Sequence, residues 1–184
     1  MLTALFAAFC FIIFPIHKAL ADGKPQTKVV SLPKASFQDP VSGDTMKYLG
    51  LPRQKNFSLN DIRGPIIVIE LFSTYCTSCP RNVPILNDLY TAVEKDTQLK
   101  GRVTIVGIAI GNTGKEVEGY AKTYGVLFPV LTDYDFRVHD ALGNPRVPYT
   151  FFVKKSPKGK TIVDSHQGVL ESSEFALKKV RSLK

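Results

Sequence analysis

The sequence has no tryptophan and only three cysteines among its 184 residues, and it contains neither a low-complexity tract nor an internal repeat. The missing repeats exclude solenoids and propellers, which are built from units of about 20 to 50 residues. Three cysteines are too few for a small protein stapled by disulfides. Because 44% of the residues are hydrophobic and 22% are charged, a disordered or fibrous chain is excluded as well. The composition suits one globular domain with a single core.

Basic side chains outnumber acidic ones by 24 to 16, but they are dispersed along the chain. Only residues 154–160 and 178–181 carry short basic clusters. A solvated basic face is the expected result, and no nucleic-acid partner is predicted.

An apolar run at residues 2–16 is followed by the small-residue pattern Ala-Leu-Ala at 19–21. The run is short for a membrane span of about 20 residues, and the pattern resembles a cleavage site. Residues 1–21 are therefore predicted to be a signal peptide that is cleaved before Asp22. An uncleaved membrane anchor is the alternative. Either way, the predicted location is periplasmic or otherwise extracytoplasmic.

Cleavage of this signal would discard Cys10 and leave Cys76 and Cys79 as the only thiols. A lipid-anchored Cys10 is disfavoured, because Phe9 stands where such a signal needs a small residue. The two remaining cysteines must serve each other. In an oxidising compartment a pair this close can cycle between dithiol and disulfide.

Hydrophobic patterning predicts an α/β layered domain over residues 57–184, preceded by an N-terminal extension at 22–56 with one or two short strands. The strand at 66–72 is a β-branched, nearly continuous apolar run, as expected where helices cover both faces of a sheet. The other elements are expected in this order: a helical turn at 59–64, a helix from the cysteine motif to about 96, a strand at 103–110, a helix at 115–124, a strand at 128–131, a helix at 136–142, strands at 149–153 and 161–163 joined by a turn-rich loop, and a helix at 175–183.

The cysteine motif, Ser-Thr-Tyr-Cys-Thr-Ser-Cys-Pro at 73–80, lies where a strand ends and a helix begins. Backbone N–H groups and the positive end of the helix dipole stabilise a thiolate at Cys76 and make it the attacking nucleophile. Cys79 follows three residues later, so one helical turn brings its sulfur beside Cys76, where it can resolve a mixed disulfide. Pro80 is tolerated so early in a helix because the N–H it lacks would have no helical partner.

Glu70 ends the apolar strand, six residues before Cys76. Strand alternation places it beneath the motif, where desolvation would raise the pKa of its carboxyl. Such a carboxyl is suited to accept and return the proton of Cys79. A strand-end glutamate that reaches solvent is the alternative.

The strand with Phe-Ser-Thr-Tyr-Cys-Thr-Ser-Cys-Pro at 72–80, and the segment Val-Pro-Tyr-Thr-Phe-Phe-Val at 147–153, resemble the thioredoxin superfamily. The resemblance is closer to its exported thiol-disulfide oxidoreductases of the TlpA/ResA type, within the redoxin group, and covers about residues 57–184. It implies a thioredoxin-like fold: a central mixed β-sheet with helices on both faces. Residues 125–133 look like the redoxin-type insertion between the CxxC half and the cis-proline half.

The resemblance also implies roles for single residues. Glu70 falls at the position of the family's buried proton carrier, and Pro148 at that of its cis-proline. A cis bond there turns the backbone of Val147 toward the cysteine pair and an incoming substrate strand. Contacts with that substrate are implied for Tyr75, Thr77, Ser78, Val147 and Pro148.

The activity implied is disulfide exchange with protein clients in a reductant role. Apocytochrome c is a candidate client, and a membrane protein of the CcdA/DsbD type is a candidate electron donor. The redox-active disulfide Cys76–Cys79 is the only redox group expected, with no further cofactor and no metal.

Three positions depart from the family pattern. Tyr75 replaces the usual tryptophan before the first cysteine, and Asn82 stands where many ResA-like reductases carry a glutamate, so an acid–base role at 82 is not expected. The dipeptide Thr77-Ser78 differs from those common in reducing members, so the redox potential is not readable from the sequence.

Two other activities fit parts of the motif. A peroxiredoxin-like thiol peroxidase also opens a helix with its cysteine, but its P-x-x-x-T-x-x-C pattern would need proline at Ile69 and threonine at Ser73. A copper or zinc module would combine the two cysteines with His139 or His166, which falls short of a four-ligand pattern.

Two cofactor motifs are excluded. Attachment of a c-type haem needs histidine directly after Cys79, where Pro80 stands. Gly107, Gly111 and Gly114 lack the spacing of a dinucleotide-binding loop and are expected in a plain turn.

Overall fold

The computed structural model describes residues 30–37, 41–51, 56–157 and 159–183. The predicted signal peptide at 1–21, with Cys10, lies outside these residues. No helix within the described ranges is both long and apolar enough to cross a membrane.

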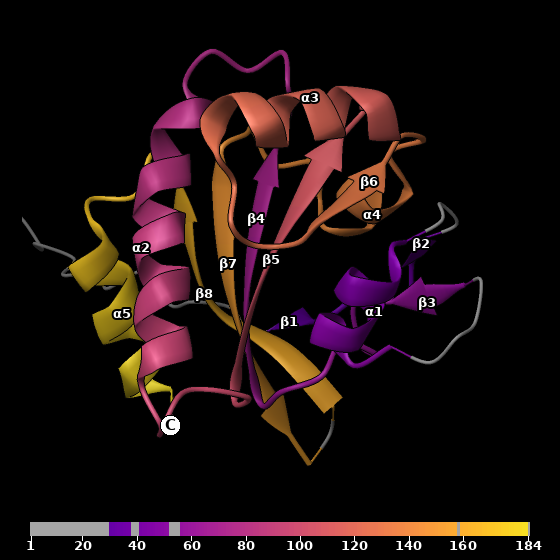
Figure 1. Ribbon diagram of the computed structural model, residues 1–184. Coiled ribbons are helices and arrows are strands. Elements are labelled where there is room, and N and C mark those ends of the chain that lie inside the picture. Colours follow the sequence, from indigo (N-terminus) through magenta and orange to yellow (C-terminus); the bar gives the residue numbers. More distant parts are fainter. Residues whose placement is uncertain (1–29, 38–40, 52–55, 158, 184) are drawn as a thin grey trace, which may run out of the picture.

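A six-stranded mixed sheet with the strand order β1-β8-β7-β4-β5-β6 forms the centre of the molecule (Figure 1). β4 pairs in parallel with β5, and β5 with β6, whereas β4–β7, β7–β8 and β1–β8 are antiparallel. A second sheet contains β2 and β3. The strands are β1 (Val30–Ser31), β2 (Ser36–Phe37), β3 (Phe57–Ser58), β4 (Ile66–Phe72), β5 (Val103–Ile110), β6 (Val130–Asp133), β7 (Tyr149–Ser156) and β8 (Gly159–Gln167).

Helices cover both faces of the large sheet (Figure 1). On one face α2 and α5 pack side by side, and α3 lies beside the end of α2. On the other face lie α1, α4 and the small sheet. The helices are α1 (Gly43–Leu49), the 3-10 helix η1 (Cys79–Arg81), α2 (Asn82–Lys95), α3 (Gly114–Tyr124), α4 (Arg137–Ala141) and α5 (Ser173–Ser182).

The central strand β4 is buried along its whole length. Ile66 and Val68 pack toward α2 and α5, whereas Ile67 and Ile69 pack toward α1 and α4. This two-sided burial explains the nearly continuous apolar run, because each side chain meets a layer of helices. The thioredoxin-like arrangement expected from the sequence is confirmed.

Most predicted elements are present. The strands at 66–72 and 103–110 are confirmed with these bounds, and the helix after the cysteine motif ends at Lys95. The strand expected at 128–131 begins two residues later, as β6. The strands expected at 149–153 and 161–163 are longer than predicted, because β7 and β8 continue their pairing to Ser156 and Gly159.

Three local expectations are wrong. Residues 59–64 form a turn rather than a helical turn. Gly107 lies inside β5, where an added Cβ would come within 3.2 Å of Phe72 and Phe128, so close packing rather than a turn explains it. Helix α1 was not expected, although Ser42 caps its start and Gly50 ends it in a left-handed conformation.

The described part of the predicted extension packs into the core. Phe37 and Phe57 stack with their ring centroids 5.1 Å apart. The buried Lys160 of β8 donates hydrogen bonds to the carbonyls of Asn60 and Ile62 and so ties the turn after β3 to the large sheet. The division of the chain at residue 57 stays a prediction.

Candidate active site

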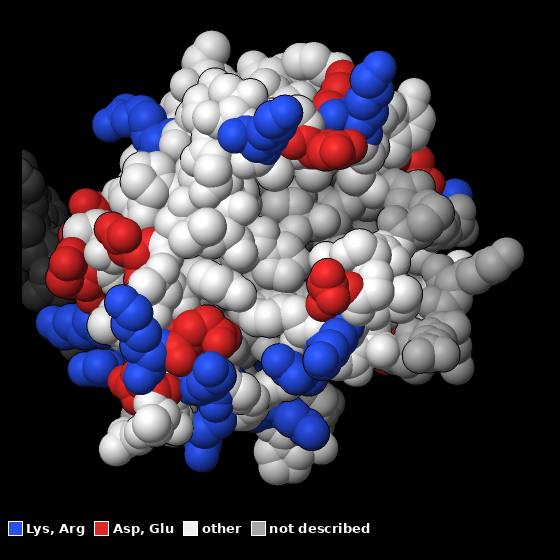
Figure 2. All heavy atoms as spheres, viewed as in Figure 1, with Lys and Arg blue, Asp and Glu red and all other residues white. Residues whose placement is uncertain are grey.

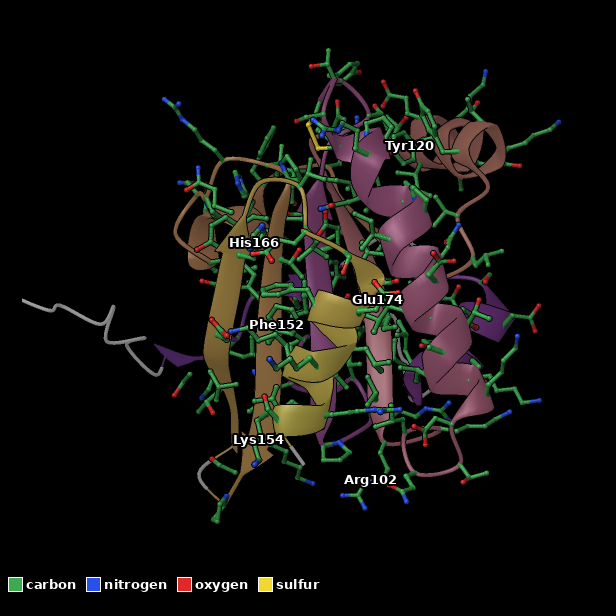
Figure 3. All side chains as sticks on the ribbon, turned by 90° about the vertical axis from the view of Figure 1, so that its left-hand side faces the viewer. Arg102, Tyr120, Phe152, Lys154, His166 and Glu174 are labelled. Atoms are coloured by element: carbon green, nitrogen blue, oxygen red, sulfur yellow. A yellow bond between two sulfur atoms is a disulfide. The ribbon has the colours of Figure 1, made fainter. Side chains whose placement is uncertain are left out.

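Cys76 and Cys79 form a disulfide at the end of β4, beside the start of α2 (Figure 3). Their Cα atoms are 5.5 Å apart. Cys76 is half-buried, whereas only 1% of Cys79 is exposed. An incoming sulfur can therefore reach Cys76 but not Cys79. The helical winding begins at Cys79 and not at Cys76, yet the pair meets as the spacing predicts.

Three groups surround the sulfur of Cys76. The backbone N–H of Cys79 donates to it at 3.2 Å, and the Ser78 hydroxyl lies 3.5 Å away. The carbonyl oxygen of Val147 lies 3.9 Å away, across the sequence from the motif. On reduction, the N–H and the hydroxyl are placed to stabilise a thiolate at Cys76. Thr77, which is exposed, faces solvent beside the pair.

The peptide bond between Val147 and Pro148 is cis, as the resemblance implied. Pro148 is buried, and Val147 is half-buried and packs against the cluster that contains Cys79. The structure thus brings the predicted residues at 75–79 and 147–148 together at one end of the sheet.

The loop before the cysteines is fixed by Asn112, which follows β5 and is fully buried. Its Oδ1 accepts from the Ser73 hydroxyl at 3.2 Å and from the Thr74 N–H at 2.9 Å, and its Nδ2 donates to the Thr74 hydroxyl at 2.6 Å. Sequence reasoning missed Asn112, because nothing near it in the sequence indicates a partner 38 residues away.

Tyr75 is 73% exposed and stands beside the disulfide. Its hydroxyl donates a hydrogen bond to Glu116, and this bond raises the pKa of Tyr75. Glu116 also forms a capping box with Thr113 at the start of α3. The hydrogen bond from Tyr75, with those from Thr113, lowers the pKa of Glu116 to about 2. Tyr75 is therefore held in place from α3.

Glu70 is 2% exposed and accepts two hydrogen bonds inside the protein. Asn82 Nδ2 donates to one carboxyl oxygen at 2.7 Å, and the Thr150 hydroxyl donates to the other at 2.6 Å. Burial raises the pKa of Glu70 to about 7, although these hydrogen bonds partly oppose the rise. Glu70 and Cys79 line the same small cavity. The alternative of a solvent-exposed strand end is excluded.

Asn82 is 1% exposed and bridges two parts of the fold. While its Nδ2 donates to Glu70, its Oδ1 accepts from the N–H of Leu170 at 2.8 Å. The sequence marked Asn82 only as a departure from the family pattern. In the structure it orients the buried carboxyl.

His139 and His166, the candidate metal ligands, each face a loop carbonyl. A ring nitrogen of His139 lies 3.0 Å from the Pro145 oxygen, and one of His166 lies 3.1 Å from the Val169 oxygen. The described residues contain no group of three or more histidine, cysteine or acidic side chains that is placed to hold a metal.

Comparison with known proteins agrees with this geometry. Residues 42–162 match the AhpC/TSA family. The chain is 31% identical over 105 residues to "Thiol-disulfide oxidoreductase ResA" of Geobacillus thermodenitrificans, which covers 57% of this chain and 58% of that protein. For the ResA of Bacillus subtilis the identity is 32% over 108 residues, covering 59% and 56%. The chain thus spans less than two thirds of the length of these relatives.

Solved structures share the fold. StoA from Bacillus subtilis superposes with a TM-score of 0.57 at 16% identity, covering 80% of this chain and 97% of that one. A secreted Mycobacterium tuberculosis disulfide oxidoreductase homologous to E. coli DsbE gives 0.54 at 22% identity, covering 70% and 89%. With a matching family over two thirds of its sequence and a thioredoxin-like fold, the chain belongs to the AhpC/TSA family.

Proposed function

We propose that this protein is an extracytoplasmic thiol-disulfide oxidoreductase that reduces disulfides in protein clients. One observation carries the proposal: an accessible sulfur, Cys76, is bonded to a buried one, Cys79, above a buried carboxyl whose pKa lies at about 7. A structural disulfide needs neither the difference in access nor the carboxyl.

The reaction transfers two electrons from the dithiol to the client. The Cys76 thiolate attacks a client disulfide, forms a mixed disulfide and releases one client thiolate. Cys79 then loses its proton to Glu70 and attacks the sulfur of Cys76, which forms the Cys76–Cys79 disulfide and releases the second client thiolate. Both client thiolates take protons from solvent. When an electron donor reduces the disulfide again, Glu70 returns the proton to Cys79.

Five residues are placed to contact the client. Tyr75 offers an exposed aromatic ring, and Thr77 and Ser78 lie on the open side of the disulfide. The cis bond between Val147 and Pro148 holds the Val147 carbonyl near Cys76, where a client strand can pair with the backbone.

The proposal places the protein outside the cytoplasm, because an apolar N-terminal run precedes an Ala-Leu-Ala site at 19–21. The name and title of two similar proteins, ResA and the secreted oxidoreductase, support the same location. Clients are proteins with exposed disulfides, apocytochrome c among them. A membrane protein of the CcdA/DsbD type supplies the electrons.

Insulin reduction with a small dithiol as electron source tests the mechanism. Cys76→Ser should abolish turnover, and Cys79→Ser should accumulate mixed disulfides at Cys76. Thr123→Ser, an equally small change at an exposed position of α3, serves as the control. Turnover by Cys76→Ser at the rate of the control would contradict the mechanism.

The direction of electron flow is tested by equilibrating the protein with glutathione. A potential near ~−270 mV agrees with a reductant, whereas one near ~−120 mV identifies an oxidant.

A thiol peroxidase is the second candidate, because the family match covers residues 42–162. Ile69 and Ser73 occupy the positions where the peroxidase pattern has proline and threonine, and Ile69 is buried in β4. The reductant account therefore expects slow, uncatalysed consumption of hydrogen peroxide. Rapid consumption that is lost in Cys76→Ser would favour the peroxidase.

A further inference from the structure

A groove of about 560 Å³ opens beside the disulfide, on the side of Val147. It lies between the loop before Cys76, the end of β5, and the segments around α4 and before Pro148. Its lining residues come from four separate parts of the sequence: Ser73, Tyr75, Ile110, Gly111, Phe136, His139 and residues 144–147. Sequence spacing gives no sign of it.

The backbone around this groove is strained. In the described part of the chain, only two residues other than glycine have a positive φ, and both line the groove: Phe136 at 62° and Asn144 at 52°. A bulky aromatic residue in the left-handed region costs about 1 to 2 kcal/mol. Burial does not offset this cost, because 47% of Phe136 is exposed. Such strain concentrates at functional sites.

Gly111 allows the ring of Phe136 to approach the groove. A Cβ atom at Gly111 would lie 2.5 Å from the tip of the ring. The ring therefore rests on the backbone of Gly111. Together with Tyr75, which is 73% exposed, it gives the groove two accessible aromatic side chains.

The groove carries one unpaired positive charge. Arg146 is exposed, lines the groove, and forms no ion pair with any described residue. The carboxylates nearby already have partners: Glu116 accepts from Tyr75 and Thr113, and Asp135 pairs with Arg137. An acidic group on a bound chain would therefore meet Arg146 without competition.

We infer that this groove selects clients by sequence: an extended client segment whose cysteine meets Cys76 places an apolar or aromatic side chain against Tyr75 and Phe136, and an acidic side chain at Arg146. This inference rests on the proposed function and adds the chemical class of the preferred client. Apolar contact supplies the affinity, and the charge supplies the preference among clients.

Matched peptides with a single cysteine test the preference. Each peptide carries Phe or Ser, and Glu or Lys, next to the cysteine, before it in one series and after it in the other. The cysteine is capped as an uncharged 2-pyridyl disulfide, and release of the pyridyl thione by pre-reduced protein gives a second-order rate constant. In one of the two series we expect the Phe/Glu peptide to react about fivefold faster than the Phe/Lys peptide, as one ion pair allows.

Two variants locate the preference. Arg146→Glu should invert the ratio between Glu and Lys peptides, and Arg146→Gln should abolish it. Phe136→Gly, which relieves the positive φ, should reduce the ratio between Phe and Ser peptides. Lys178→Glu changes an exposed charge on α5 that does not line the groove, so its ratios should match the wild type.

The outcomes separate this inference from the proposed function. Equal rates for Glu and Lys peptides in both series, or a ratio that Arg146→Glu leaves unchanged, would overturn the preference. Failure with every peptide, while 2,2′-dipyridyl disulfide is reduced normally, would also overturn it and leave the redox function intact. Failure with the small disulfide as well would overturn the proposed function itself.

Discussion

The buried carboxyl of Glu70 should make the stability of the oxidised protein fall as the pH rises. Burial raises the pKa of this group from 4.5 to about 7 in the folded state. Between these two values the folded protein binds more protons than the unfolded chain, so the free energy of unfolding decreases with increasing pH. At about 1.4 kcal/mol per pH unit, the contribution lost by pH 8 is about 3 kcal/mol.

Glu70→Gln removes this titration and keeps the shape of the side chain. Its amide can still accept from Asn82 and can donate to the hydroxyl of Thr150. Urea unfolding of the oxidised protein from pH 5 to 8 should therefore show a shallower decrease for Glu70→Gln than for the wild type. The difference between the two curves isolates Glu70 from the histidines, which titrate in both proteins.

Glu118→Gln, at an exposed position of α3, is the matched control and should follow the wild type. A Glu70→Gln curve that runs parallel to the wild type over the whole range would refute the reasoning. It would mean that Glu70 is ionised in the folded protein, and its assignment as the proton acceptor for Cys79 would fail with it.

Three further substitutions test the packing around the site. Asn112→Ala removes the hydrogen bonds that fix the loop before Cys76, and should lower the free energy of unfolding in urea by about 1 to 3 kcal/mol; an unchanged midpoint would contradict that role. Lys160→Met leaves two loop carbonyls without their donor, and should also destabilise by about 1 to 3 kcal/mol, whereas equal or higher stability would show that the lysine is dispensable. Gly111→Ala should destabilise because of its φ of +64° and the clash with Phe136, and adding Phe136→Ala should recover only the clash; full additivity of the two changes in urea midpoint would argue against the contact.

The sequence predicts the elements whose signal is local and strong. β4 follows from an unbroken β-branched run, and the disulfide follows from the spacing of Cys76 and Cys79. Helix α1 is only seven residues long and buries Leu49 alone, so its stability comes from the sheet on which it packs. Its caps at Ser42 and Gly50 were readable signals that the apolar pattern did not reinforce.

The contacts that shape the site join residues far apart in the sequence. Glu70 is predictable as a buried carboxyl, but its partners Asn82 and Thr150 lie 12 and 80 residues away. The pairing of β4 with β7 sets Glu70 opposite Thr150, and no local pattern states that register. The groove at Phe136 and Arg146 arises in the same way, from segments that only the folded chain brings together.

The central claim is that Cys76 is the reachable, ionised sulfur of a reversible pair. Its most direct test treats the fully reduced protein with limiting iodoacetamide near neutral pH and locates the label by peptide mass spectrometry. The account predicts that Cys76 is alkylated first, that Cys79 stays unlabelled, and that the oxidised protein does not react. Labelling of Cys79 before Cys76, or resistance of both thiols after reduction, would contradict it.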